Sequence, residues 1–88
     1  MPNTRVPIPA EARRAMGKRL RRARWDTNLS MRELADRVGV TQNSVAHWEH
    51  GGLPGVRLRL TLAKFYKTTE RELFAEFFDA MDRAERAS

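Results

Sequence analysis

Closely spaced helix start and stop signals divide this sequence, and they restrict it to a fold of short helices. Ser30 precedes Glu33 at the spacing of a capping box, which begins a helix. Gly39 tolerates the positive φ at which helices end, and Thr41 can cap the helix that follows through its hydroxyl. The run GGLPG at residues 51–55 can form only a loop. None of the segments between these signals requires a strand, so we expect an all-α fold.

Apolar residues recur at helical spacing between these signals and predict five helices. The expected helices cover residues 10–24, 31–38, 42–50, 56–66 and 70–86. Thr69 with Glu72 makes a second capping box at the start of the last helix. We expect a single domain over residues 10–88, because a chain of 88 residues can bury only one modest core. The proline-rich residues 1–9 are expected to form a flexible arm.

Basic charge is concentrated at the N-terminal end of the chain. The net charge is +6, and residues 1–24 hold eight basic residues and one acidic residue. Residues 68–88 hold three basic and six acidic residues, so the two ends could pair with each other. The basic end could also face phosphates, and both interpretations can hold. An excess of positive charge favours a polyanionic partner, such as nucleic acid or an anionic membrane surface.

Missing residue types and patterns exclude several classes of protein. The chain has no cysteine, which excludes disulfides, thiolate zinc sites and a cysteine nucleophile. It has no apolar run near the roughly 18 residues of a membrane span, and its start lacks the apolar segment of a signal peptide. These observations predict a soluble cytoplasmic protein.

Residues 42–50 combine a polar front with an apolar back. Successive helical residues are about 100° apart, which places Val45 and Trp48 on one side of the helix. The opposite arc consists of Gln42, Asn43, Ala46, His47 and His50. Gln and Asn can each pair with N6 and N7 of adenine, and a small alanine lets the backbone approach the base edges. Together with the preceding helix, this pattern predicts a helix-turn-helix unit over residues 31–50 that enters the major groove.

The spacing within this unit carries a family resemblance. The segment MRELADRVGVTQNSVAHW, residues 31–48, has small or apolar residues at its fourth, fifth, eighth, ninth, tenth, fifteenth and eighteenth places. The pattern G-x-x-L-R-x-x-R is formed by Gly17, Leu20, Arg21 and Arg24, and the pattern W-E-x-G by Trp48, Glu49 and Gly51. On these motifs the chain closely resembles the Cro/C1 repressor (XRE) family over about residues 17–74. The resemblance implies a five-helix, lambda-repressor-like DNA-binding domain, here with an extended C-terminal helix.

Roles for single residues follow from the resemblance. The residues implied to read bases are Gln42, Asn43, Ala46 and His47. The residues implied to contact phosphates are Thr41, Ser44, His50 and Arg57. A salt bridge between Arg24 and Glu49 would hold the first helix to the third. Met31 replaces a Gln that usually bonds a phosphate in this family, and we expect the neighbouring Arg32 to supply a substitute contact.

Other chemistries find less support in the sequence. His47 and His50 could ligate a metal, but no further ligand is placed to complete a site. Ser44 and His47 could act as nucleophile and base, but they lack an orienting acid and an oxyanion donor. We therefore expect no metal, no cofactor and no enzymatic activity.

The predicted function is sequence-specific binding of double-stranded DNA at the nucleoid. The simplest such protein is a small phage or bacterial repressor that occupies an inverted-repeat operator as a homodimer. One alternative is an antitoxin whose C-terminal helix also binds a protein partner. Another is an interaction module that has lost DNA contact, for which Met31 is the only support.

The last predicted helix carries apolar side chains over more than one face. We expect Leu73 and Phe77 to point inward. The predicted two-fold interface contains Phe74, Phe78 and Met81, with a polar rim of Glu76, Asp79 and Asp82. The alternative is that residues 75–88 fold back over a wider core.

Overall fold

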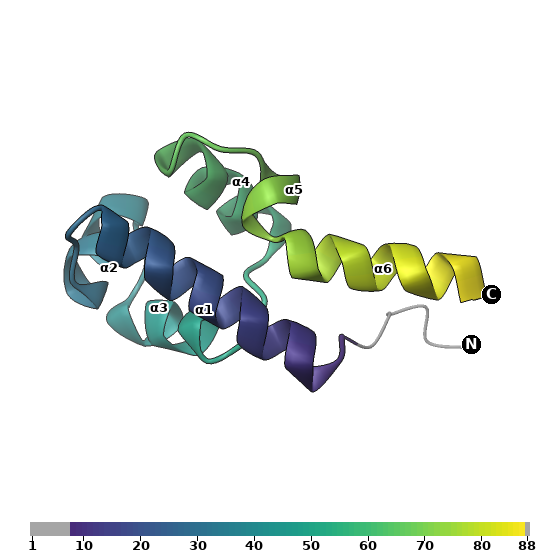
Figure 1. Ribbon diagram of the computed structural model, residues 1–88. Helices are drawn as coiled ribbons and strands as arrows, with labels where there is room; N and C mark the ends of the chain where they lie inside the picture. Colours follow the sequence, from purple (N-terminus) through teal and green to yellow (C-terminus); the bar gives the residue numbers. More distant parts are fainter. Residues whose placement is uncertain (1–7, 88) are drawn as a thin grey trace.

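The structure is a computed structural model that describes residues 8–87 and is built of helices (Figure 1). The elements are α1 (Ala10–Asp26), α2 (Met31–Val38), α3 (Gln42–Glu49), α4 (Val56–Phe65), α5 (Glu70–Leu73) and α6 (Ala75–Ala87). No strand occurs within residues 8–87, so the predicted all-α fold is confirmed. The first four predicted helices are present, with ends that differ by at most two residues. Residues 1–7 of the predicted arm lie outside the described residues.

The predicted start of α2 and the stop before α3 are formed by the expected side chains. The Ser30 hydroxyl accepts a hydrogen bond from the Glu33 amide at 3.0 Å, and the Glu33 carboxylate accepts one from the Ser30 amide at 2.9 Å. Gly39 ends α2 with a φ of 77°, in the left-handed region that glycine adopts readily. Thr41 then caps α3 by accepting from the Ser44 amide at 3.2 Å. Local sequence therefore determines the geometry of the turn that joins α2 to α3.

The second predicted capping box is only half formed. The Thr69 hydroxyl accepts from the Glu72 amide at 3.1 Å, as expected for the cap of α5. The Glu72 carboxylate, however, accepts a hydrogen bond from the Thr68 hydroxyl at 2.8 Å. The prediction of a reciprocal bond from the Thr69 amide to the Glu72 carboxylate is therefore wrong. The neighbouring Thr68 hydroxyl competes for the same carboxylate.

The single helix predicted over residues 70–86 is also wrong, because the chain leaves the helical conformation at Phe74. This residue has φ −114° and ψ 39°, which ends α5 and lets α6 begin in a new direction. In one continuous helix, the apolar residues from Leu73 to Met81 would cover more than one face of the helix. The break instead places the Phe74 side chain in the core, where it is 0% exposed, while α6 runs alongside α1. The domain therefore has six helices in its described part.

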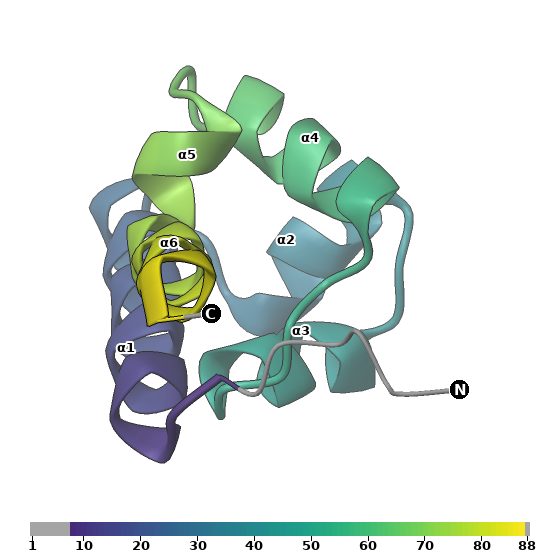
Figure 2. The ribbon, with the colours of Figure 1, turned by 90° about the vertical axis from the view of Figure 1, so that its right-hand side faces the viewer.

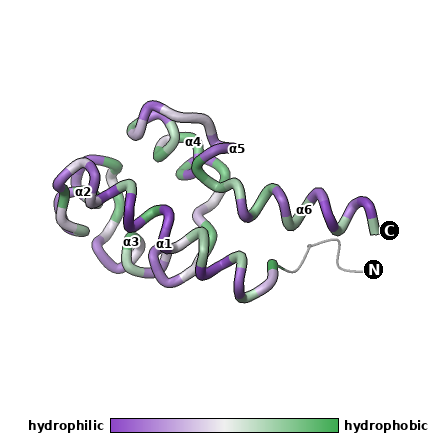
Figure 3. The backbone as a smooth tube through the Cα atoms, viewed as in Figure 1, coloured by the Kyte–Doolittle hydropathy of each residue, from purple (hydrophilic) through white to green (hydrophobic). Residues whose placement is uncertain are grey.

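The helices enclose one core, with α1 as its long axis. In Figures 1 and 2, α1 and α6 lie side by side, and α3 packs against the same helix α1. Hydrophobic and hydrophilic residues alternate along α6, as expected for a helix with one covered face (Figure 3). Gly17 lets α1 and α3 approach closely, since a Cβ there would lie 2.5 Å from the carbonyl oxygen of Glu49. The core residues are Met16, Leu20, Leu34, Ala35, Val45, Trp48, Leu62, Ala63, Leu73 and Phe74.

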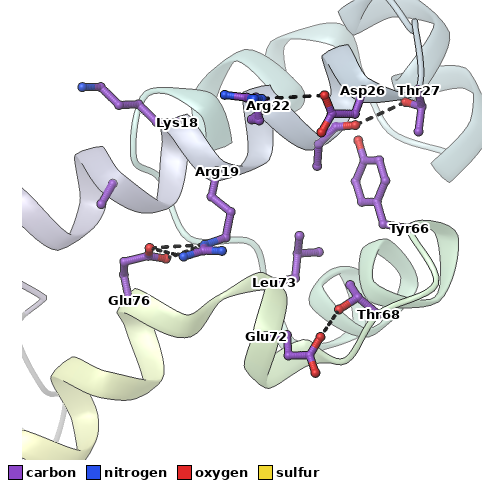
Figure 4. A pocket seen from close by; sticks show the side chains of 12 residues that line it. Lys18, Arg19, Arg22, Asp26, Thr27, Tyr66, Thr68, Glu72, Leu73 and Glu76 are labelled. Carbon is purple, nitrogen blue, oxygen red and sulfur yellow. Dashed lines mark hydrogen bonds and ion pairs between the residues drawn. The ribbon is translucent and has the colours of Figure 1, made fainter.

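An open cleft of about 640 Å³ separates α1 from the segment around α5, and an ion pair spans it (Figure 4). Arg19 on α1 lies with its Nη2 atom 2.7 Å from Oε2 of Glu76 on α6. The hydrogen bond from Arg19 holds the pKa of Glu76 below its usual value. On the same cleft, burial raises the pKa of Tyr66 to about 12. Pairing between the basic and acidic ends of the chain, one of the two interpretations of the charge distribution, is therefore present at this pair.

Lys67, which follows the C-cap residue of α4, has a strained backbone conformation. Its φ is 57°, in the left-handed region, where an L side chain costs roughly 1–2 kcal/mol. We therefore expect Lys67→Gly to raise the free energy of unfolding by about 1 kcal/mol, as measured by urea denaturation. The control is Lys64→Gly inside α4, which should lower it by about 1 kcal/mol. A Lys67→Gly variant no more stable than wild type would show that the cap is unstrained.

Candidate nucleic-acid interface

Helix α3 presents one polar face to solvent and buries the opposite face. Val45 is 1% exposed and Trp48 is 5% exposed, so both belong to the core. Gln42, Asn43 and His47 are exposed. None of these three side chains makes a hydrogen bond or ion pair with another residue of the described part of the chain. The amide groups of Gln42 and Asn43 are thus available to a ligand, with the half-buried Ala46 nearby, whereas the Nε2 edge of the His47 ring lies against Gly52.

Three of the residues predicted at phosphates are engaged within α3 and its cap. The hydroxyls of Thr41 and Ser44 lie 3.1 Å apart and share a hydrogen bond. The Nδ1 atom of His50 lies 2.7 Å from the Ala46 carbonyl oxygen, which leaves the Nε2 edge of that exposed ring for other contacts. These side chains shape the two ends of α3, and contact with phosphates stays a prediction for them.

Two other cations predicted at phosphates are exposed and unengaged. Arg32 is the second residue of α2, and Arg57 is the second residue of α4. Neither guanidinium forms an ion pair or a hydrogen bond with any residue between 8 and 87. By contrast, Arg59 on the same helix as Arg57 is bound to Glu70 at 2.7 Å. Arg32 and Arg57 can therefore meet an external anion without breaking an internal pair.

A buried ion pair fixes α3 to α1. The Arg24 guanidinium donates from Nε to Oε2 of Glu49 at 2.6 Å and from Nη2 to Oε1 at 2.9 Å, a bidentate arrangement. A third bond runs from Nη1 to the Leu29 carbonyl oxygen at 2.9 Å. The side chains are 8% and 2% exposed, and the hydrogen bonds with Glu49 raise the pKa of Arg24 above its usual value. This clamp holds the end of α3 in one orientation, which a recognition helix requires.

Arg21 is a residue whose position the sequence did not reveal. Its Nε lies 3.5 Å from Oε1 of Glu49, and its guanidinium lies over the Trp25 ring. The signal that could have indicated this is its place in the G-x-x-L-R-x-x-R pattern, one turn before Arg24. Glu49 thus faces two cations.

Comparison with protein families identifies the chain. A family model described as Helix-turn-helix matches residues 19–73, which is more than half of the chain and includes all of α2 and α3. The chain belongs to this helix-turn-helix family. The resemblance to the Cro/C1 (XRE) type is thereby confirmed, and membership of this family makes the protein a DNA-binding transcriptional regulator.

Comparison with solved structures supports the same fold. The crystal structure of the clp gene regulator ClgR from Corynebacterium glutamicum matches with a TM-score of 0.65 and 23% sequence identity. The match covers 92% of the helix-turn-helix chain and 87% of the ClgR chain. At this identity the similarity shows a shared fold. No curated protein sequence matches the chain.

The predicted dimer interface requires a correction at one residue. Phe74 is 0% exposed within the chain, so it cannot lie on a surface between two copies. It is buried because α5 ends there and directs the ring into the core. Phe78 and Met81 are partly exposed on α6, although the Arg71 guanidinium lies 4.8 Å from the centre of the Phe78 ring. Leu73 is buried, as predicted.

Among residues 8–87, no group of three histidine or carboxylate side chains is arranged to hold a metal ion. None of the described helices combines the length and the apolar character needed to cross a membrane.

Proposed function

We propose that this helix-turn-helix protein is a sequence-specific repressor that reads double-stranded DNA with α3 and occupies an inverted-repeat operator as a homodimer. The observation that carries the proposal is the exposed arc of Gln42, Asn43 and His47, whose polar groups have no partner in residues 8–87. A helix that only packed would gain nothing from three such side chains on one face. The buried Arg24–Glu49 pair supports the proposal, because a reading helix has to be held rigidly.

The proposed mechanism separates base reading from positioning. The N-terminal half of α3 enters the major groove, where Gln42 and Asn43 can each make a bidentate pair with adenine. Ala46 lets the backbone of α3 approach the base edges. Arg32 and Arg57 supply phosphate contacts, which set the register and add affinity without selecting a sequence. Repression then follows from occupancy of a promoter.

Base reading and phosphate contact predict different responses to substitution. Gln42→Ala or His47→Ala is expected to lose about 1–3 kcal/mol of binding free energy on the operator, with little change on random DNA. Arg57→Ala should weaken binding to both DNAs and reduce the salt slope by about one unit. The operator is first selected from random DNA by the wild-type protein, and binding is then titrated at several salt concentrations. If Gln42→Ala loses the same binding free energy on the operator and on random DNA, Gln42 does not read bases.

The proposed dimer uses the partly exposed residues of α6. A single unit reads few base pairs, and two-fold dimers place two recognition helices about one DNA turn, roughly 34 Å, apart. We expect Phe78→Asp to give a folded monomer that loses binding to the inverted repeat but keeps weak binding to a half-site. Sedimentation and operator titration measure the two properties.

The control for this test is Leu60→Asp on α4. Leu60 is 54% exposed, so its replacement tests a second exposed apolar position without disturbing the core. If Leu60→Asp is monomeric and Phe78→Asp is dimeric, the interface lies on α4 and not on α6. A wild-type protein that is monomeric at micromolar concentration, both free and on the operator, would refute the dimer itself.

The antitoxin alternative depends on the same surface of α6. Phe78 and Met81 could contact a different protein, and DNA binding would then serve autoregulation. Native mass measurement of the protein isolated from its source cell distinguishes the two proposals. A stable complex with a second polypeptide supports the antitoxin, whereas a homodimer supports the repressor.

A further inference from the structure

Gly52 lies directly against the side chain of His47. The Gly52 amide donates a hydrogen bond to the His47 carbonyl oxygen at 2.9 Å, which folds the loop back onto the last turn of α3. A Cβ at Gly52 would overlap the Nε2, Cδ2 and Cε1 atoms of the His47 imidazole. The ring of a predicted base-reading residue therefore occupies the space that any side chain at position 52 would need.

The backbone at Gly52 does not itself require glycine. Its φ lies outside the left-handed region, in contrast to Gly51 with φ 103° and Gly39 with φ 77°. A Cβ at Gly17 would meet the backbone of Glu49, which cannot move without shifting a helix. At Gly52 the three atoms nearest to an added Cβ all belong to one exposed side chain, so the protein could accept a larger residue there if His47 moved.

We propose that Gly52 is a positioning residue for DNA recognition: it seats the His47 ring against the loop after α3 and so determines which base edge that ring reads. This inference rests on the proposed function, since it assumes that α3 reads DNA. The His47 ring forms no hydrogen bond with the described residues, and its Nε2, Cδ2 and Cε1 atoms pack on Gly52, so this packing contact restricts the orientation of the ring. A side chain at position 52 turns the ring to another rotamer and changes the preferred base.

The test compares Gly52→Ala with wild type in two measurements. In the free protein, the NMR signals of the His47 ring are expected to shift, because the added methyl group displaces the ring. On DNA selected by the wild-type protein, affinity should fall about tenfold, with no change on random DNA. Selection from random DNA by the variant should recover a site that differs at one position in each half-site.

The matched control is Gly55→Ala in the same loop, where an added Cβ would have no atom within 4 Å. It is expected to leave the His47 signals, the affinity and the selected site unchanged. Combined with His47→Ala, the substitution Gly52→Ala should cause no additional loss, because the ring on which it acts is gone. If Gly52→Ala fails to fold, the double variant should fold, since it lacks the overlapping ring.

Two results would overturn the proposal. One is Gly52→Ala with unchanged His47 signals and an unchanged selected site. The other is an equal loss of affinity with and without the His47 ring. If His47→Ala keeps full operator affinity while Gly52→Ala still shifts the ring signals, Gly52 seats the ring as proposed but the base-reading role of His47 fails.

Discussion

Glu49→Ala is expected to lower the free energy of unfolding by about 3–5 kcal/mol, because it leaves the Arg24 charge buried without its partner. The Arg24 and Glu49 side chains are only 8% and 2% exposed, so water cannot replace the lost carboxylate. The guanidinium would keep only its bond to the Leu29 carbonyl oxygen at 2.9 Å. Denaturation followed by circular dichroism measures the loss. A domain of this size has about 5–15 kcal/mol of stability, so the variant should lose a large part of it.

The control for this prediction is Glu76→Ala, which breaks the more exposed ion pair with Arg19. The Arg19 side chain is 46% exposed, and solvent screens the charge that remains. We expect a loss below about 1 kcal/mol. Similar small losses for both variants would show that the Arg24–Glu49 pair is accessible to water, and Arg24 would then become a candidate for phosphate contact.

Phe74→Ala is expected to destabilise the fold by about 3–5 kcal/mol and to leave the association state of the folded protein unchanged. The ring is 0% exposed and lies at the junction of α5 and α6, so its removal opens a cavity in the core. Thermal unfolding and sedimentation of the same samples measure stability and association together.

The comparison with Phe78→Ala distinguishes a core role from an interface role. Phe78 is partly exposed, so its truncation should cost less than half as much stability as that of Phe74. Phe74→Leu fills most of the cavity and should restore part of the loss. A Phe74→Ala variant that dissociates without losing stability would place Phe74 at an interface after all, against its burial in the structure.

The sequence predicted best where short-range rules decide the outcome. The capping box at Ser30, the glycine at position 39 and the cap at Thr41 act through bonds between residues at most four apart, so the helix-turn-helix unit could be located without any tertiary information. The polar arc of α3 was predictable for a related reason. Helical periodicity alone separates Gln42 and Asn43 from Val45 and Trp48.

Predictions failed where two valid local patterns competed. The Thr69 amide and the Thr68 hydroxyl are both able to donate to the Glu72 carboxylate, and local sequence rules do not rank these two donors. The apolar residues from Leu73 to Met81 are compatible with one straight helix and equally with two shorter ones. Burial of Phe74 selects the second arrangement, and that choice depends on the shape of a core formed by residues far away in the chain.

Local patterns were sufficient to predict the all-α class, the helix-turn-helix unit and the side chains that face outward from α3, because capping and helical periodicity are local. The break at Phe74, the contact of Arg21 with Glu49 and the packing of the His47 ring on Gly52 became visible only in the folded chain. Each of these depends on where a loop or a helix terminus lies relative to a helix packed beside it. Such relative positions follow from side-chain volumes in a shared core, which no local pattern specifies.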